Sequence, residues 1–364
     1  MAQSNFVDRL VSFHLFFCTV LLGTALLLGC GGDDTQTAEN DSSGSGGPTP
    51  AHARSGRSLI KIDGSSTVAP MSAAVAELFQ AEHPDIRVTV GISGTGGGFK
   101  KFLDPRADLR TDINDASRTI KPAEMQQAER LGIAFIELPI VLDGIAVVVH
   151  PHNDFCDHLT VEELKRMWEP DSEVDNWNQV RAGFPDLPLK LYGPGPDSGT
   201  FDYFTEAIVG KEKASRSDYT MSEDDNVLVQ GVAGDPGGLG YFGFAYFHEN
   251  RDRLKLLGID PGNGTPVQPS LETIRGGIYR PLSRPLLLYV NAASAKRPEV
   301  AAFMAFYYEN AAEIAQHPRI GYVPLPENLY PLLMERFHKG TTGSLMVDLS
   351  PEANVNLYEL YAGQ

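Results

Sequence analysis

The chain has 364 residues, of which 47 are acidic and 30 are basic, so its formal net charge is −17. This balance argues against a protein that grips nucleic acid broadly, because phosphate backbones are held by clustered Lys and Arg. A hydrophobic content of 42% is enough for a packed core, while three cysteines and the lack of an internal repeat exclude a disulfide scaffold and a solenoid.

The first segment is an apolar stretch, Leu10–Leu28, which runs into Gly29-Cys30-Gly31. An N-terminal apolar stretch that ends in small residues is typical of a secretion signal, so residues 1–29 are expected to be a signal peptide. Its end resembles the bacterial lipobox, in which the chain is cut before the cysteine and Cys30 becomes lipidated. The alternative is an uncleaved anchor, since the stretch could span a membrane. Either way, we expect a membrane-anchored protein in the periplasm or at the cell surface.

Residues 31–57 contain no Val, Ile, Leu, Met, Phe, Tyr or Trp. Such a segment cannot bury enough apolar surface to order itself, so 30–57 is expected to be the lipidated cysteine and a disordered linker with a reach of about 30 Å. The folded part is then 58–364, a length typical of two domains. Cys156 is expected to be a structural thiol, because Asp154 and Asp157 would raise its pKa.

The folded part alternates short apolar runs with helical stretches, which predicts an α/β architecture. Strands are expected at Ser58–Ile62, Ile86–Ile92, Ile133–Leu138, Gly144–His150, Leu187–Tyr192, Leu239–Phe244 and Leu286–Asn291. Helices are expected at Pro70–His83, Phe99–Leu103, Pro122–Leu131, Val161–Trp168, Phe201–Val209, Val227–Ala233, Glu299–Gln316 and Pro326–Phe337. The tail 339–364 has too weak a periodicity to be placed.

Four short loops rich in Ser, Thr, Gly and Asp each precede a predicted helix. They are Asp63–Thr67, Ser93–Gly98, Asp115–Arg118 and Asp197–Thr200. In any one loop these residues would ordinarily cap the helix or mark a turn. Four such loops that face one cleft would instead offer free helix N–H groups, hydroxyls and close backbone amides to an anion, with Arg118 as the full charge.

Motifs along most of the chain then support a family resemblance. They are IDGSSTVAP (62–70), GTGGGFKKF (94–102), DINDASRTI (112–120), DSGTFDYF (197–204), SEDDNVLVQGVAGDPGGLGYFGFAYF (222–247) and PLSRPLLLYVN (281–291). These runs resemble the phosphate-binding subunit, a substrate-binding lipoprotein, of bacterial phosphate ABC transporters. The resemblance covers roughly 58–337. It implies a two-lobed periplasmic-binding-protein fold, type II-like, whose lobes are joined by crossing strands and close on one dehydrated phosphate.

The resemblance also implies site residues, one position at a time. The implied phosphate ligands are Ser66, Thr67, Thr95, Gly96, Ser117, Arg118, Ser198, Gly199 and Thr200. Some family members place an arginine four residues before the serine of the fourth loop, where this chain has Pro194, and an aspartate where it has Arg118. Arg118 is therefore expected to supply the cation from the opposite lobe. The carboxylate that would accept a proton from phosphate stays open among Asp63, Asp115 and Asp197.

The resemblance implies high-affinity phosphate binding outside the cytoplasm and delivery to ABC permease subunits in the inner membrane. It implies no catalytic residue, metal or cofactor and no nucleic-acid partner. Lobe 1 is expected to combine 58–147 with 256–364, and lobe 2 to be 148–255. The alternatives are another tetrahedral oxyanion, a phosphate-sensing role without transport, and a serine hydrolase or phosphatase that uses Ser66 or Ser198.

Three further patterns are discounted. Gly238–Gly243 matches G-x-G-x-x-G, but an aromatic strand-like run through 247 follows it instead of a helix, which argues against dinucleotide binding. Ser58–Lys61 matches S-x-x-K but reads as a strand without a clear K-T-G partner. His150 and His152 share a strand face without further metal ligands. Trp168 and Trp177 are expected in the core.

Overall fold

The computed structural model describes residues 58–364 except 197, 223, 318–319, 348–355 and 364. The predicted signal peptide 1–29, the lipidation site Cys30 and the linker 31–57 lie outside the described residues. Leu59–Gln364 form one compact unit. Within the described part of the chain, no helix is both long enough and apolar enough to cross a bilayer.

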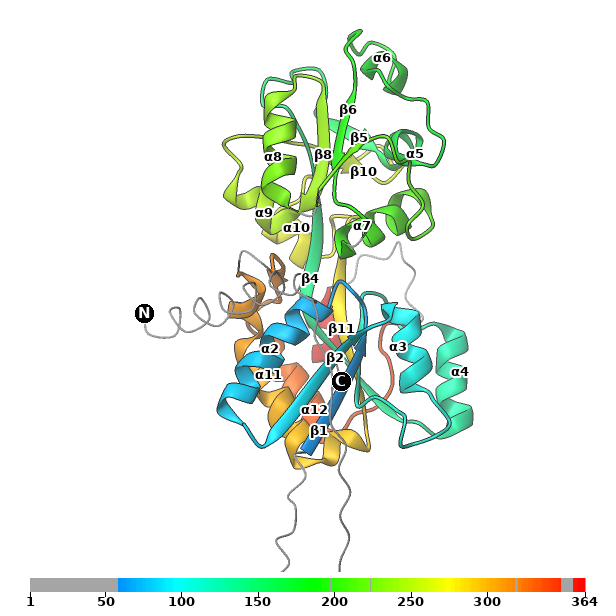
Figure 1. Ribbon diagram of the computed structural model, residues 1–364, viewed down its shortest axis with the longest axis vertical. Helices are drawn as coiled ribbons and strands as arrows, with labels where there is room; N and C mark the ends of the chain where they lie inside the picture. The colour runs from blue at the N-terminus through cyan, green and yellow to red at the C-terminus, as the bar shows by residue number, and fades with distance from the viewer. Residues whose placement is uncertain (1–57, 197, 223, 318–319, 348–355, 364) are drawn as a thin grey trace, which may run out of the picture. The chain divides into compact units, whose positions relative to one another are not determined.

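Strands and helices alternate along the chain (Figure 1), as the sequence predicts. The strands are β1 (Ser58–Gly64), β2 (Ile86–Ile92), β3 (Ile113–Ala116), β4 (Phe135–Val149), β5 (His158–Thr160), β6 (Lys190–Gly193), β7 (Thr220–Met221), β8 (Gly238–Gly243), β9 (Lys255–Leu256), β10 (Gly258–Asp260), β11 (Ser283–Asn291) and β12 (Val323–Pro324). The helices are α2 (Ala69–Glu82), α3 (Gly94–Phe102), α4 (Pro122–Leu131), α5 (Val161–Trp168), α6 (Trp177–Val180), α7 (Gly199–Phe204), a π-helix (Thr205–Val209), α8 (Asp225–Gly234), α9 (Phe244–Glu249), α10 (Leu271–Arg275), a 3-10 turn (Ser294–Lys296), α11 (Pro298–Ala315), α12 (Leu329–Lys339) and α13 (Leu357–Ala362).

One sheet of ten strands runs through the described residues in the order β2-β1-β3-β11-β4-β8-β6-β7, and β9 and β12 also pair with β4. β1 and β3 are parallel, whereas β11 is antiparallel to both β3 and β4. β4 and β11 therefore lie side by side in the middle of the sheet, and Figure 1 shows both passing between the group around β1 and β2 and the group around β6 and β8.

The long strand β4 takes the place of two predicted strands, so that prediction is wrong. We expected a break between Leu138 and Gly144, but β4 is continuous and all of its residues are buried. Pro139 is tolerated because the register with β11 shifts between Leu286 and Leu287, and proline within a sheet is found at such irregularities. The continuous strand links the two parts of the sheet through a rigid, fully buried element.

Helix α3 starts five residues earlier than predicted, so the glycines of the second loop lie in its first turns. Gly98 is required there by packing. A Cβ atom on Gly98 would stand 1.9 Å from Asn114 Oδ1 and 2.6 Å from Gly64 Cα. The close approach of α3 to the end of β1 and to β3 therefore depends on the missing side chain. This contact brings the start of α3 next to the loops that follow both strands.

The aromatic run after Gly240 is also different from the prediction. The strand β8 ends at Gly243, and α9 begins at Phe244, so the cluster 241–247 is divided between a strand and a helix. A helix does follow G-x-G-x-x-G here, but its glycines lie in β8 rather than in a turn. They therefore do not form the loop that a dinucleotide phosphate would need.

The C-terminal tail packs on β4 through a buried carboxylate. Glu137 accepts hydrogen bonds from the backbone N–H of Leu345 at 2.8 Å, from the Ser344 hydroxyl and from the Tyr289 hydroxyl at 2.8 Å. Burial raises the pKa of Glu137 above its usual range. The tail that the sequence could not place is thus tied to the central strand by hydrogen bonds to one side chain.

Candidate functional site

Three of the four predicted loops converge on one polar cavity of about 360 Å³. Its lining includes six predicted site residues: Ser66, Thr67, Thr95, Gly96, Ser117 and Arg118. The loops meet because β1 and β3 are adjacent and parallel, so that their carboxyl ends lie at the same edge of the sheet. The third loop follows β3, and the first loop follows β1.

The hydroxyl groups of the cavity are held in place by one another and by the backbone. Thr95 Oγ1 lies 3.1 Å from Ser117 Oγ and accepts a hydrogen bond from the Ser117 N–H at 3.1 Å. The N–H of Thr67 donates to Ser65 Oγ at 3.2 Å. These contacts fix the second loop against the third, so the donors facing the cavity are oriented before any ligand arrives.

The N-terminus of α3 opens on this cavity without a side-chain cap. Ser93 occupies the cap position, but its side chain accepts no hydrogen bond from the helix, and Gly94, Thr95, Gly96 and Gly97 all line the cavity. The first N–H groups of a helix have no partner within it and carry a partial positive charge. This end of α3 therefore presents neutral donors and a favourable dipole to an anion.

Arg118 reaches the cavity but is already paired. Its guanidinium donates to both carboxylate oxygens of Glu124, at 2.9 and 2.8 Å, and to the carbonyl of Thr119 at 3.0 Å. A Cβ atom on Gly96 would lie 3.5 Å from Arg118 Nη2, an ordinary contact distance, so the guanidinium lies directly beside the start of α3. Part of the Arg118 charge is thus neutralised by a residue of α4.

The fourth loop takes a different position from the one the resemblance implies. Ser198, Gly199 and Thr200 are not among the lining residues. Ser198 caps α7 by accepting from the Thr200 N–H at 3.2 Å, and the Gly199 carbonyl accepts from Thr67 Oγ1 at 3.4 Å. A Cβ atom on Gly199 would stand 2.6 Å from Thr67 Oγ1. The loop therefore packs against the first loop at the edge of the cavity.

The helical segment after that loop supplies residues that the sequence analysis missed. Asp202, Tyr203 and Glu206 line the cavity. The Ser66 hydroxyl donates to Asp202 Oδ2 at 3.2 Å, and Lys213 Nζ lies 3.6 Å from Oδ1. Burial raises the pKa of the Asp202 carboxyl, while Lys213 acts in the opposite direction. A buried carboxylate thus lies in the wall of the cavity, hydrogen-bonded to one of its hydroxyl donors.

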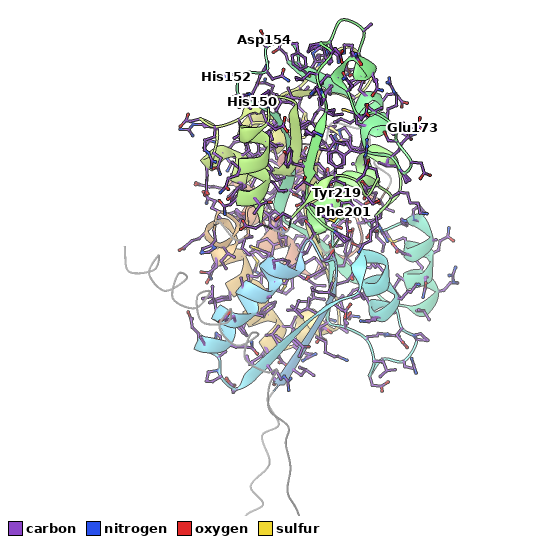
Figure 2. All side chains as sticks on the ribbon, turned by 45° about the horizontal axis from the view of Figure 1, so that its top comes forward. His150, His152, Asp154, Glu173, Phe201 and Tyr219 are labelled. Carbon is purple, nitrogen blue, oxygen red and sulfur yellow. The ribbon has the colours of Figure 1, made fainter. Side chains whose placement is uncertain are left out.

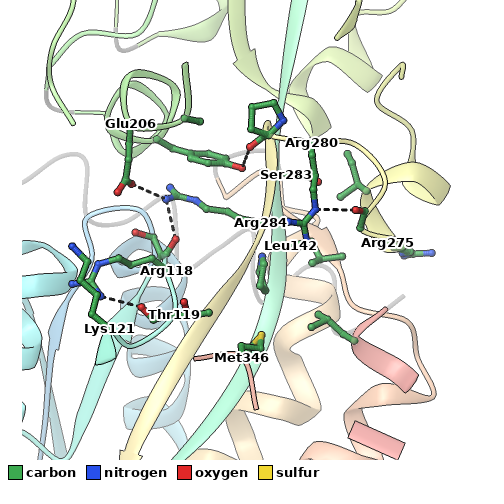
Figure 3. A pocket seen from close by; sticks show the side chains of 18 residues that line it. Arg118, Thr119, Lys121, Leu142, Glu206, Arg275, Arg280, Ser283, Arg284 and Met346 are labelled. Carbon is green, nitrogen blue, oxygen red and sulfur yellow. Dashed lines mark hydrogen bonds and ion pairs between the residues drawn. The ribbon is translucent and has the colours of Figure 1, made fainter. Parts of the chain in front are cut away.

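A second arginine, Arg284 on β11, was also missed. Its Nη1 donates to the Ser117 carbonyl at 2.9 Å and its Nη2 donates to Thr67 Oγ1 at 3.2 Å. Its guanidinium carbon lies 3.6 Å from the centre of the Tyr203 ring, a cation–π contact. Figure 3 shows Arg284 reaching from β11 towards Glu206 and Arg118. The PLSRP run was recognised as a motif, but nothing local to it indicates that its arginine faces loops more than 160 residues away.

Arg284 also pairs with a buried carboxylate on the neighbouring strand. Asp143 of β4 lies opposite Arg284 in the register, and Nε donates to its Oδ2 at 3.4 Å. Burial raises the pKa of Asp143, and the Arg284 charge opposes that shift. The two strands that join the halves of the sheet therefore share an ion pair at the wall of the cavity.

Two of the three carboxylates singled out from the sequence, Asp63 and Asp115, are not among the described lining residues. Asp63 accepts hydrogen bonds from Lys101 Nζ at 2.6 Å and from the Ser93 hydroxyl. Asp115 is fully buried and accepts from Ser72 Oγ at 3.0 Å, and burial raises its pKa to about 8. Asp197 lies outside the described residues. Asp63 and Asp115 therefore brace the loops from below.

The described part of the lining holds carboxylates but no histidine. The described residues hold no group of three or more His, Cys, Asp or Glu side chains placed to bind a metal ion. His150 and His152 lie at the top of the view in Figure 2, whereas Phe201 of α7 lies near its middle. Cys156, Trp168 and Trp177 are buried.

The chain is similar to known proteins over most of its length. Residues 35–311 match the family model described as the PBP superfamily domain. The chain is 50% identical over 289 residues to Protein SphX of Synechocystis sp., covering 79% of this chain and 84% of that protein. It is 36% identical over 316 residues to the phosphate-binding protein PstS of Staphylococcus saprophyticus, covering 86% of this chain and 91% of that protein.

The fold is similar to that of a solved structure over most of the chain. That solved structure is the crystal structure of a possible phosphate binding protein from Planctomyces limnophilus, which is 43% identical in sequence. The match has a TM-score of 0.73 and covers 78% of this chain and 98% of that one.

Proposed function

The chain belongs to the PBP superfamily, and within it to the family of the phosphate-binding protein PstS; from this premise we propose that it binds inorganic phosphate outside the cytoplasm and delivers it to an ABC permease. It has the predicted α/β fold of that superfamily. In this proposal β4 and β11 are the strands that join its two lobes. In this role the protein is a substrate-binding protein and performs no chemistry on its ligand.

The observation behind the proposed site is the polar cavity at the meeting point of three loops. Hydroxyls of Ser66, Thr67, Thr95 and Ser117 and the free N–H groups at the start of α3 are the donors we assign to the phosphate oxygens. Hydrogen bonds to a charged group each contribute roughly 1.5–3 kcal/mol. Several of them exceed the roughly 8 kcal/mol that micromolar binding needs, even after the cost of ordering.

Two arginines supply the positive charge in this proposal. Arg118 acts from the third loop, and Arg284 acts from β11, where it already contacts the first and third loops. The local attraction outweighs the net charge of −17, because dipoles and cations at the cavity act at short range whereas surface charges are screened. The fourth-loop residues Ser198, Gly199 and Thr200 join the ligand in this proposal when the contact between Thr67 and Gly199 opens.

We propose Asp202 as the proton acceptor, in place of the candidates Asp63, Asp115 and Asp197 that the sequence offered. A carboxylate accepts a hydrogen bond but donates none when ionised. Phosphate near neutral pH carries a proton that it can donate to such a group, whereas sulfate carries none. Asp202 lines the cavity beside the Ser66 hydroxyl, so its carboxylate would favour phosphate and repel sulfate.

The anchoring of the protein is a separate proposal. Cys30 would be lipidated after removal of residues 1–29 and would hold the folded part to the membrane through the linker 30–57. Lobe 1 would combine 58–147 with 256–364, and lobe 2 would be 148–255. Mass spectrometry of the membrane-extracted protein tests the anchor, since a Cys30→Ala variant should lose the lipid mass and leave the membrane fraction.

A panel of oxyanions tests the proposed function. Thermal unfolding is measured with phosphate, arsenate, sulfate and molybdate, because a ligand at 100 times its dissociation constant adds about 2.7 kcal/mol. We expect stabilisation by phosphate that sulfate does not reproduce. Stabilisation by another oxyanion alone would support the alternative ligand. If the protein binds phosphate but its deletion leaves phosphate uptake by the cells intact, the result would support the sensing role.

A further inference from the structure

A second cavity, of about 510 Å³, lies beside the polar one (Figure 3). The two cavities share six lining residues: Ser117, Arg118, Lys121, Tyr203, Glu206 and Arg284. The two cavities are therefore neighbours, and side chains that they share, including the stacked pair of Arg284 and Tyr203, stand between them.

The second cavity has a different chemistry from the first. Its remaining walls include the apolar side chains of Leu142, Ile274, Pro281, Pro285, Met346 and Leu357. Arg275 and Arg280 add cations to those that it shares with the polar cavity, and Glu206 is the single carboxylate in the described lining. An apolar group attached to an anion is the chemical complement of such walls.

The volume of the second cavity is not explained by an open conformation of the polar cavity. Ser66 already donates to Asp202 at 3.2 Å, and Thr67 already donates to Gly199 at 3.4 Å, so the walls of the polar cavity touch across it. The polar cavity alone has room for a phosphate ion. Its volume of about 360 Å³ is some twelve times the roughly 30 Å³ that one water molecule takes in the liquid. Inorganic phosphate would thus leave the second cavity without an occupant.

We propose that the two cavities together also bind monosubstituted phosphoryl anions, R–PO₃²⁻, in which R is an apolar organic group. The phosphoryl group sits among the loop donors of the polar cavity, and R extends past Arg284 and Tyr203 into the second cavity. Arg284 lies between the two cavities, because its side chain lines both of them and donates a hydrogen bond to the Ser117 carbonyl of the third loop. This inference rests on the proposed phosphate site and widens its substrate class to organophosphonates and phosphate monoesters.

Isothermal titration with phenylphosphonate tests the proposal. Its carbon–phosphorus bond does not hydrolyse, so no inorganic phosphate is released during the titration. Inorganic phosphate is titrated in parallel, methylphosphonate serves as the ligand without a large apolar group, and benzenesulfonate serves as the ligand without the phosphoryl group. Competition between phenylphosphonate and phosphate shows whether they share the polar cavity.

A cavity-filling variant identifies where the phenyl group lies. Ala207 is half-buried in the π-helix and lines the second cavity but not the first, so Ala207→Phe would occupy that volume. The matched control is Ala312→Phe, at a half-buried alanine of α11 that lines neither cavity. Ala207→Leu is the milder variant, and phosphate binding by each variant reports that its site is folded.

We expect wild-type protein to bind phenylphosphonate in competition with phosphate and more tightly than methylphosphonate. Ala207→Phe should weaken phenylphosphonate by about tenfold or more, the scale at which pocket filling discriminates, and leave phosphate unchanged. Wild-type protein that binds phosphate but not phenylphosphonate overturns this inference and leaves the proposed function standing. Equal phenylphosphonate binding by wild type and Ala207→Phe also overturns it. Failure of phosphate itself to bind removes the proposed function and the inference with it.

Discussion

At the level of single residues, the two arginines of the cavity have different partners. Arg118 makes its hydrogen bonds within its own region, to Glu124 and Thr119. Arg284 instead links the first loop, the third loop and Asp143 of β4. Loss of Arg284 therefore removes a cation from the site and also leaves a buried carboxylate without its partner.

We predict that Arg284→Met weakens phosphate binding by at least about tenfold, because charge-assisted hydrogen bonds contribute roughly 1.5–3 kcal/mol each. It should also lower the free energy of unfolding by about 3–5 kcal/mol, since Asp143 is left buried and unpaired.

Arg118→Met should weaken binding with a smaller loss of stability, because Glu124 is more exposed than Asp143. Titration calorimetry and urea unfolding measure the two effects. The surface variant Arg106→Met is the control, and equal stability losses in Arg284→Met and Arg118→Met would contradict the assignment.

Asp202→Asn tests the basis of anion selectivity. The amide can donate a hydrogen bond, so it no longer penalises an anion without a proton. We expect the ratio of sulfate affinity to phosphate affinity to rise by about tenfold or more in competition titrations. The variant removes the unfavourable buried contact between a carboxylate and an anion that carries no proton. An unchanged ratio of phosphate to sulfate affinity would show that Asp202 does not set selectivity.

The residues that sequence reasoning found and missed differ for a physical reason. Ser66, Thr95 and Ser117 lie in loops with a local signature, because a helix start needs small polar residues near it. Arg284 and Asp202 carry no such signature. Their roles follow from the pairing of β11 with β4 and from the packing of α7 beside the first loop, which are contacts between distant parts of the chain.

At the level of elements, α3 shows how packing overrides local propensity. Glycines disfavour helix, which is why a loop was predicted over 93–98. The helix nevertheless starts at Gly94, and at Gly98 it passes so close to Gly64 and Asn114 that a side chain does not fit. The bounds of β2, α4 and α5 agree with the sequence, since their patterns involve only local alternation or capping.

Gly98→Ala tests this account of α3. Alanine favours a helix over glycine by about 1 kcal/mol, so propensity alone predicts stabilisation. We expect the opposite, a loss of roughly 1–3 kcal/mol, because the Cβ atom would overlap Asn114 Oδ1 and crowd the backbone at Gly64. Gly234→Ala at the end of α8, where no atom lies within 4 Å of the new Cβ, is the control. Stabilisation of both variants in urea unfolding would refute the packing argument.

At the level of the whole molecule, the buried carboxylate Asp115 makes stability depend on pH. Burial raises its pKa to about 8, against an ordinary value of 3.8. Between these two values the folded protein keeps a proton that the unfolded chain has lost. The free energy of unfolding therefore falls as pH rises through this window, and the fall ends once Asp115 ionises in the folded protein as well.

We predict that Asp115→Asn removes this part of the pH dependence. As pH rises from 5 to 8, the free energy of unfolding of the wild type should fall relative to that of the variant by up to about 1.4 kcal/mol per pH unit. Urea unfolding at unit steps of pH measures it. Parallel curves for the two proteins would mean that Asp115 does not hold a proton in the folded state.

The architecture was predictable to the level of class, and the family resemblance supplied the two lobes. The continuous strand β4 and the tail bound to Glu137 were not predictable, because Pro139 interrupts the local pattern and the tail depends on a side chain some 200 residues away. The central claim is that separate turns of this fold converge on one phosphate.

A crystal structure of the protein with saturating phosphate tests that claim most directly. The account predicts one phosphate within hydrogen-bond distance of Ser66, Thr95, Ser117 and Arg284, with Asp202 accepting its proton. Phosphate bound on another face of the molecule, with this cavity filled only by water, would contradict it.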